Sequence, residues 1–175
     1  EELSTDLIDA LGYLIKTMGS AFVPYMDSVV APFVTPLLGD GTPSAVRVNG
    51  LCPFVDMIEF GGEEAQKYMP GVLPVLVGGI NADAPGVRQV SAYGFGVILE
   101  RSIGAAAAHV GDALRQMAAA VSRDEADGED ERFATENVVS ALSKVLITCG
   151  GRPGVDEAAL WPLWLSKLPI EEDEQ

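Results

Sequence analysis

The side chains that could do chemistry in this sequence do not form a catalytic set. His109 is the only histidine, and no serine or cysteine nucleophile stands at motif spacing from it. A general base needs a positioned partner within hydrogen-bond reach, so a surface or capping role suits His109 better. Gly94-Phe95-Gly96 lies inside an expected helix and leads into no phosphate loop. The sequence therefore predicts that the protein is not an enzyme.

The two cysteines show neither a metal motif nor a redox motif. Cys52 and Cys149 lie far apart in apolar stretches, without a CxxC partner or a nearby histidine. We interpret them as buried structural thiols in a reducing compartment. No metal and no cofactor is expected.

The chain is strongly acidic. Its 26 acidic and 11 basic residues give a formal net charge of −15. Such a surface repels nucleic acids and anionic membranes, so we expect neither to bind directly, and it attracts basic partners instead. The alternative that the acids only keep the protein soluble stays open. No apolar run reaches the roughly 20 residues that a membrane span needs, which predicts a soluble, intracellular protein.

A repeat in the sequence indicates which secondary-structure elements position these side chains. Thr42-Pro43-Ser44-Ala45-Val46-Arg47 returns loosely, further along the chain, as Ala84-Pro85-Gly86-Val87-Arg88. Each copy follows an aspartate and a short turn, and each leads into an apolar helical run. A period of about 40 residues built from two helices is typical of HEAT repeats, which stack into an extended, curved surface. The predicted fold is therefore all-α, an α-solenoid of stacked antiparallel helix pairs.

Apolar stripes at spacings of three and four predict about eight helices. Interior prolines should bend or break the second helix and interrupt the fourth near Pro70 or Pro74. Six acids in eight residues predict that 123–131 is a mobile acidic loop. The expected helices are 4–18, 22–38, 43–60, 63–80, 85–102, 105–121, 132–148 and 155–168.

These helices form a single solenoid over residues 1–175. Its units are roughly a half repeat at 1–20, then 21–62, 63–104 and 105–150, and a partial unit at 151–175. Both ends have the character of cuts through a longer protein. At the turns, an aspartate and an arginine recur in phase, which predicts a ladder of bonds that joins the units through Asp40, Arg47, Asp83 and Arg88.

Four motifs carry a resemblance to a known family. Leu51-Cys52-Pro53-Phe54-Val55-Asp56-Met57-Ile58-Glu59 and Val87-Arg88-Gln89-Val90-Ser91-Ala92-Tyr93-Gly94-Phe95-Gly96-Val97 resemble segments of the karyopherin-β (importin-β superfamily) nuclear transport receptors, importin beta-3 branch. Ala134-Thr135-Glu136-Asn137 and Leu163-Trp164-Leu165-Ser166-Lys167-Leu168-Pro169 are similar to the same branch, in order and at compatible distances.

The resemblance implies a fragment from the carboxy-terminal third of a receptor that carries protein cargo through the nuclear pore under Ran control. Implied partners are cargo proteins with basic signals, and Ran GTPase and nuclear pore proteins through the full-length receptor. The implied location is cytoplasm and nucleus. The alternative is a HEAT-repeat scaffold subunit of a multiprotein complex.

Candidate cargo-facing residues follow from the repeat. Glu59 and Glu100 are separated by the same interval as Val46 and Val87, so stacking should align them, with Asp56 one turn before Glu59, into an acidic strip. Such a strip could pair with lysine or arginine side chains of an extended basic peptide. Asn137 lies in the equivalent region of a later helix, and its amide could bond a peptide backbone. For each residue, the alternative is a solvated helix face or a bridge between repeats.

Overall fold

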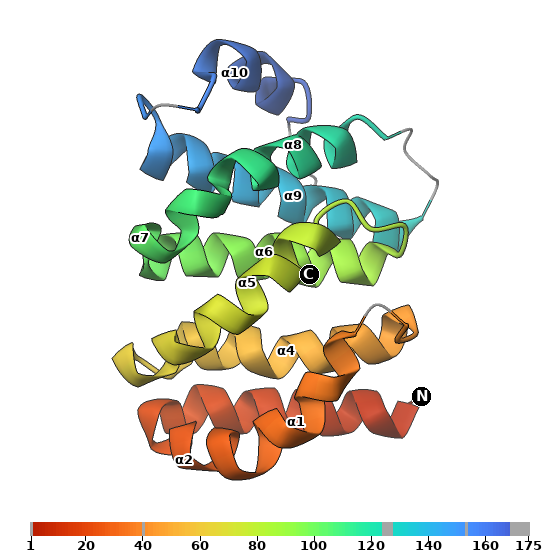
Figure 1. The fold of residues 1–175 in the computed structure, drawn as a ribbon. Coiled ribbons are helices and arrows are strands. Elements are labelled where there is room, and N and C mark those ends of the chain that lie inside the picture. The colour runs from red at the N-terminus through yellow and green to blue at the C-terminus, as the bar shows by residue number, and fades with distance from the viewer. Residues whose placement is uncertain (1, 40, 124–127, 153, 169–175) are drawn as a thin grey trace.

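In a computed structural model, the described residues (2–39, 41–123, 128–152 and 154–168, with side chains from residue 6 on) contain helices and turns and no strand. One layer of helices stacks side by side in chain order (Figure 1). It comprises α1 (Glu2–Met18), α4 (Ser44–Phe60), α6 (Pro85–Arg101) and α9 (Glu129–Cys149). The bent segment 19–38, α5 (Met69–Gly79), α8 (Val110–Val121) and α10 (Glu157–Leu165) pack against this layer. The predicted all-α solenoid is confirmed.

The described residues form seven helices of nine residues or more, and not about eight. The difference lies in the expected helix 22–38, because Pro24, Pro32 and Pro36 cannot donate backbone hydrogen bonds and clash with the preceding turn. This segment bends as the prolines predicted. It consists of a 3₁₀ turn (Gly19–Phe22), α2 (Val23–Tyr25), a π-helical turn (Met26–Val30), α3 (Ala31–Val34) and a second 3₁₀ turn (Thr35–Leu38).

The later prolines have different effects. A 3₁₀ segment, Glu63–Tyr68, changes into α5 directly before Pro70, at one of the two interruption points expected from the sequence. Pro53, by contrast, lies inside α4, which continues through it as one helix. The expected helix 105–121 is also divided, into α7 (Ile103–Ala106), a 3₁₀ turn (Ala107–His109) and α8.

The acidic loop predicted over 123–131 does not extend to residue 131. Residues 129–131 form the first turn of α9, and 124–127 lie outside the described residues. Acidic side chains are favourable at this position because the amino-terminal end of a helix carries a partial positive charge. Charge repulsion, which suggested a loop over the whole of 123–131, is thus outweighed at Glu129, Asp130 and Glu131.

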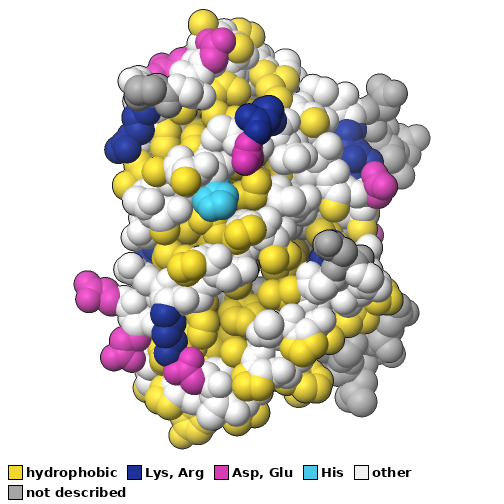
Figure 2. Space-filling view, in the orientation of Figure 1, with side chains coloured by type: hydrophobic (Ala, Val, Ile, Leu, Met, Phe, Trp, Pro, Cys, Tyr) yellow, Lys and Arg dark blue, Asp and Glu magenta, His cyan; other side chains and the backbone are white. Residues whose placement is uncertain are grey.

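A single apolar core runs through the stack, from Ile15 in α1 to Leu160 in α10. Helix α6 lies at its centre, in contact with α4, α5 and α9, and its small residues let these neighbours approach. A Cβ atom at Gly94 would lie 2.7 Å from Cγ2 of Val55. On the face seen in Figure 2, charged side chains are scattered and hydrophobic ones gather between them.

One stretch of the described residues, Asp6–Leu38, is long and apolar enough to cross a membrane, judged by length and composition alone. This corrects the expectation that no run reaches that length. In the structure this stretch is not one straight helix but two helical arms. Gly19, whose φ of 55° is left-handed, separates the arms, and the chain folds back there (Figure 1).

Candidate functional site

A groove of about 650 Å³ lies along the layer formed by α1, α4, α6 and α9. All four helices contribute to its wall, so it crosses several repeat units. Its lining mixes carboxylates, amides, phenols and aliphatic side chains. The lining residues are Ile8, Asp9, Gly12, Tyr13, Lys16, Val48, Cys52, Val55, Asp56, Gly86, Gln89, Val90, Tyr93 and Asn137.

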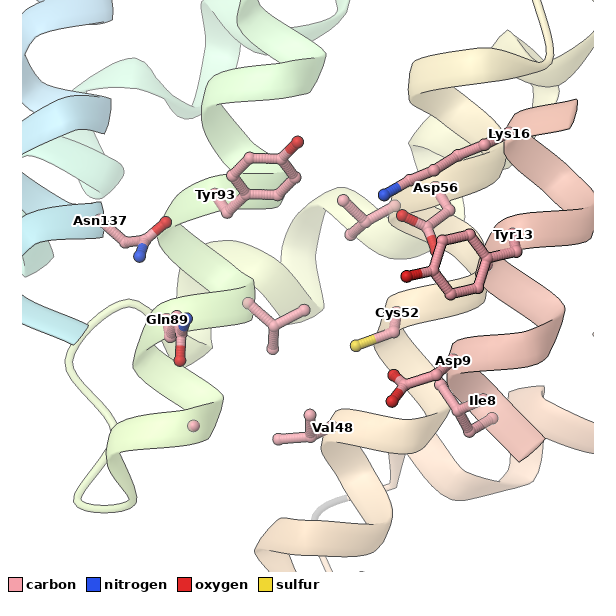
Figure 3. A pocket seen from close by; sticks show the side chains of 14 residues that line it. Ile8, Asp9, Tyr13, Lys16, Val48, Cys52, Asp56, Gln89, Tyr93 and Asn137 are labelled. Carbon is pink, nitrogen blue, oxygen red and sulfur yellow. The ribbon is translucent and has the colours of Figure 1, made fainter. Parts of the chain in front are cut away.

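The two sides of the groove differ in charge (Figure 3). Asp9, Tyr13, Lys16 and Asp56 gather on the side built by α1 and α4. The opposite side, built by α6 and α9, presents uncharged polar groups, which are the amides of Gln89 and Asn137 and the phenol of Tyr93. Charge in the groove is therefore concentrated at one side.

Asp56 is a half-buried carboxylate that no described residue pairs with or hydrogen-bonds. It packs over Gly12 of α1, where a Cβ atom would lie 2.9 Å from its Oδ2 atom. Burial raises its pKa above the ordinary value; the charge of Lys16 acts in the opposite direction, and those of Glu59 and Asp9 add to the rise. The surroundings of Asp56 thus disfavour its ionised form.

We expect Asp56→Asn to stabilise the protein at pH 7. A carboxyl group with a raised pKa binds its proton more tightly in the folded state, so the wild type loses stability as pH rises from the ordinary pKa through the raised one. Asparagine carries no charge at any pH. Urea unfolding should give the variant the higher midpoint at pH 7 and equal midpoints near pH 3, and a lower midpoint at pH 7 would contradict this.

Glu59 and Glu100, predicted to form an acidic strip, occupy equivalent places but are not among the residues that line the groove. Each carboxylate is bound by the next helix of the layer. The Tyr93 hydroxyl donates to Glu59 at 2.7 Å, and Lys144 Nζ donates to Glu100 at 2.9 Å. Burial and the bond to Glu59 raise the pKa of Tyr93. Both acids therefore join neighbouring units.

Asn137 and Cys52 both line the groove. Asn137 Nδ2 donates to the carbonyl of Phe133 at 2.9 Å, one turn earlier in α9. Cys52 is half-buried, and burial with the nearby charges of Asp56 and Asp9 raises its pKa to about 11, so the thiol is protonated at neutral pH. Cys149 is buried, and neither cysteine forms a disulfide.

The ladder residues contact their own turns and the next unit. Arg88, only 2% exposed, donates to the carbonyls of Ala82 at 2.7 Å and Asp83 at 2.8 Å, and it also pairs with Glu131. The Asp83 carboxylate is bound by Arg123, at 3.0 Å, instead of by Arg88.

The earlier turn is built in a similar way. Arg47 donates to the carbonyl of Gly39 at 2.9 Å, so both ladder arginines hold the turn that precedes their helix. Asp40 lies outside the described residues, and its ladder role stays a prediction. In the described part of the chain, no group of three or more metal-ligating side chains is found.

Sequence reasoning missed most of the groove. The repeat could have indicated two positions, because Gln89 follows Val48 by one repeat period and Tyr93 follows Cys52 by the same interval. Asp9, Tyr13 and Lys16 share one face of α1 at spacings of four and three. The motifs that defined the repeat begin after α1, so nothing in them pointed to these three residues.

No family model matches the chain. The protein described as "Probable importin-5 homolog" from Dictyostelium discoideum is 24% identical over 178 residues, which cover 99% of this chain. "Importin subunit beta-3" from Saccharomyces cerevisiae is 22% identical over 176 residues and 100% of this chain. The chain is similar to both importins along its whole length. The resemblance found in the four motifs is thereby confirmed, and the chain spans 16% of the length of each of these relatives.

Proposed function

We propose that this chain is a segment of a nuclear transport receptor that carries protein cargo through the nuclear pore under Ran control. Its relationship to two importins along its whole length supports this proposal. In this proposal the protein works in cytoplasm and nucleus. Ran and nuclear pore proteins bind the full-length receptor, of which this segment supplies a solenoid surface for cargo or partner contacts.

Within the segment, the groove between α1 and α9 is the surface that we assign to an extended stretch of a partner protein. It is long because four stacked helices line it, and it offers two amides that suit a peptide backbone. The unpaired Asp56 and the net charge of −15 favour a positively charged partner, such as cargo with a basic signal. This charge match is the observation that carries the assignment.

The test uses a carrier protein fused to a basic import signal and the immobilised chain. Binding should weaken about tenfold between low and physiological salt, because exposed charges are screened over about 8–10 Å. The control is the same fusion with its basic residues changed to glutamine. Binding that ignores both salt and these substitutions would refute the charge match.

A second experiment tests the receptor itself. A protein that contains this sequence is isolated with its cargo and is then incubated with Ran loaded with GTP or with GDP. We expect GTP-loaded Ran alone to release the cargo. A complex that binds neither Ran nor basic cargo would indicate a HEAT-repeat scaffold and would overturn the proposed function.

A further inference from the structure

The carboxylates near the groove fall into two groups. Glu59 and Glu100 already accept hydrogen bonds from Tyr93 and Lys144. Asp9 and Asp56 line the groove, and among the described residues neither has a hydrogen-bond or ion-pair partner. A cation that enters the groove therefore finds two unsatisfied carboxylates, and not the longer acidic strip expected from the repeat.

These two carboxylates lie on the same side of the groove. Asp9 comes from α1 and Asp56 from α4, and Figure 3 shows them beside the ring of Tyr13. An aromatic face next to carboxylates is favourable for a lysine or arginine side chain, because the ring attracts a cation and the carboxylates pair with it. Across the groove, Gln89, Tyr93 and Asn137 offer no formal charge.

We propose that the groove holds a single cationic side chain, between Asp9 and Asp56 beside Tyr13, and that the rest of the groove holds an uncharged part of the same extended segment. This proposal rests on the proposed function and specifies the partner of that site. Glu59 and Glu100 stay bonded to α6 and α9 when the partner binds. A segment with one well-placed lysine or arginine is therefore sufficient, and further positive charges add little.

Lys16 limits the affinity of this site. It is the only cationic side chain among the described residues that line the groove, and its charge acts on Asp56. Its Nζ atom lies 5.4 Å from the centre of the Phe60 ring. Since Lys16 repels an incoming cation and partly neutralises Asp56, its removal should favour binding.

The experiment uses short peptides of serine, glycine and valine that carry no arginine, one arginine or four arginines. Fluorescence anisotropy gives their affinities for the full chain, and changes in the NMR signals of the Gln89 and Asn137 side-chain amides, which line the groove, locate them. We expect the first arginine to improve binding about tenfold, and the three others together to add no more than about threefold. Asp56→Asn should abolish the gain from the first arginine, and Lys16→Met should increase it.

Glu100→Gln is the matched control, because it removes the same charge from the same helix layer at a carboxylate already engaged by Lys144. It should leave the peptide affinities unchanged. The single-cation site is wrong if the four-arginine peptide binds more than tenfold tighter than the one-arginine peptide and Glu100→Gln weakens the binding of the four-arginine peptide. That result would leave the groove assignment intact. If no peptide shifts the side-chain amide signals of Gln89 and Asn137, the groove assignment itself fails.

Discussion

Replacing Arg88 with alanine lowers the free energy of unfolding by about 3 kcal/mol, the range expected when one partner of a buried pair is removed. Arg88 is 2% exposed and donates to the carbonyls of Ala82 and Asp83. Its pair with Glu131 joins α6 to the beginning of α9. Alanine would leave two carbonyls and a half-buried carboxylate without their donor.

The measurement is urea unfolding followed by circular dichroism. Arg115→Ala is the control, because Arg115 pairs with Asp112 on an exposed face of α8, and we expect a loss of no more than about 1 kcal/mol. Arg88→Lys should recover little, since one ammonium group cannot replace a planar fork that contacts three acceptors. Equal losses for the Arg115 and Arg88 variants would show that burial does not distinguish the two sites.

Replacing Gly94 with leucine destabilises the protein by about 3 kcal/mol, at the upper end of the range for overpacking a core. Gly94 lies where α6 meets α4 and α5. A Cβ atom there would lie 2.7 Å from Cγ2 of Val55 and 3.0 Å from Cδ2 of Leu76, so even the first added carbon displaces two buried side chains.

The matched control is Gly78→Ala. Gly78 is also helical, in α5, but nothing lies within 4 Å of a Cβ atom built there. Alanine should stabilise the helix by up to about 1 kcal/mol. Thermal unfolding of the two variants should therefore shift in opposite directions. A stable Gly94→Leu variant would mean that α6 does not pack as closely as described.

The arrangement of the helices could be predicted from the sequence because it depends on periodic features. The recurrence of Arg47 at Arg88 gave the repeat, and the prolines gave the bends. A loop was predicted for the acidic block because repulsion among neighbouring acids was considered without the favourable charge at the start of α9. Glu129, Asp130 and Glu131 gain from the partial charge of that end.

The groove was harder to predict, because side-chain partners do not follow the repeat. The repeat period alone predicts equivalent positions for Glu59 and Glu100. In the structure, however, Glu59 is bound by Tyr93, 34 residues later, and Glu100 is bound by Lys144, 44 residues later. Neither interval equals the repeat period that separates Glu59 from Glu100. Which acid remains free is decided by the particular side chain on the adjacent helix, and Asp56 stays free because small Gly12 lies opposite.

The groove has no wall made by one rigid element; each of its sides is shared by separate helices of a stack. Its width therefore depends on the tilt of each helix against the next. The hydrogen bonds from Tyr93 to Glu59 and from Lys144 to Glu100 help to fix this tilt. A change in the coil of the whole solenoid would open or narrow the groove. By thermodynamic reciprocity, a bound segment that contacts the helices from α1 to α9 would resist changes in their tilt and make this part of the solenoid stiffer.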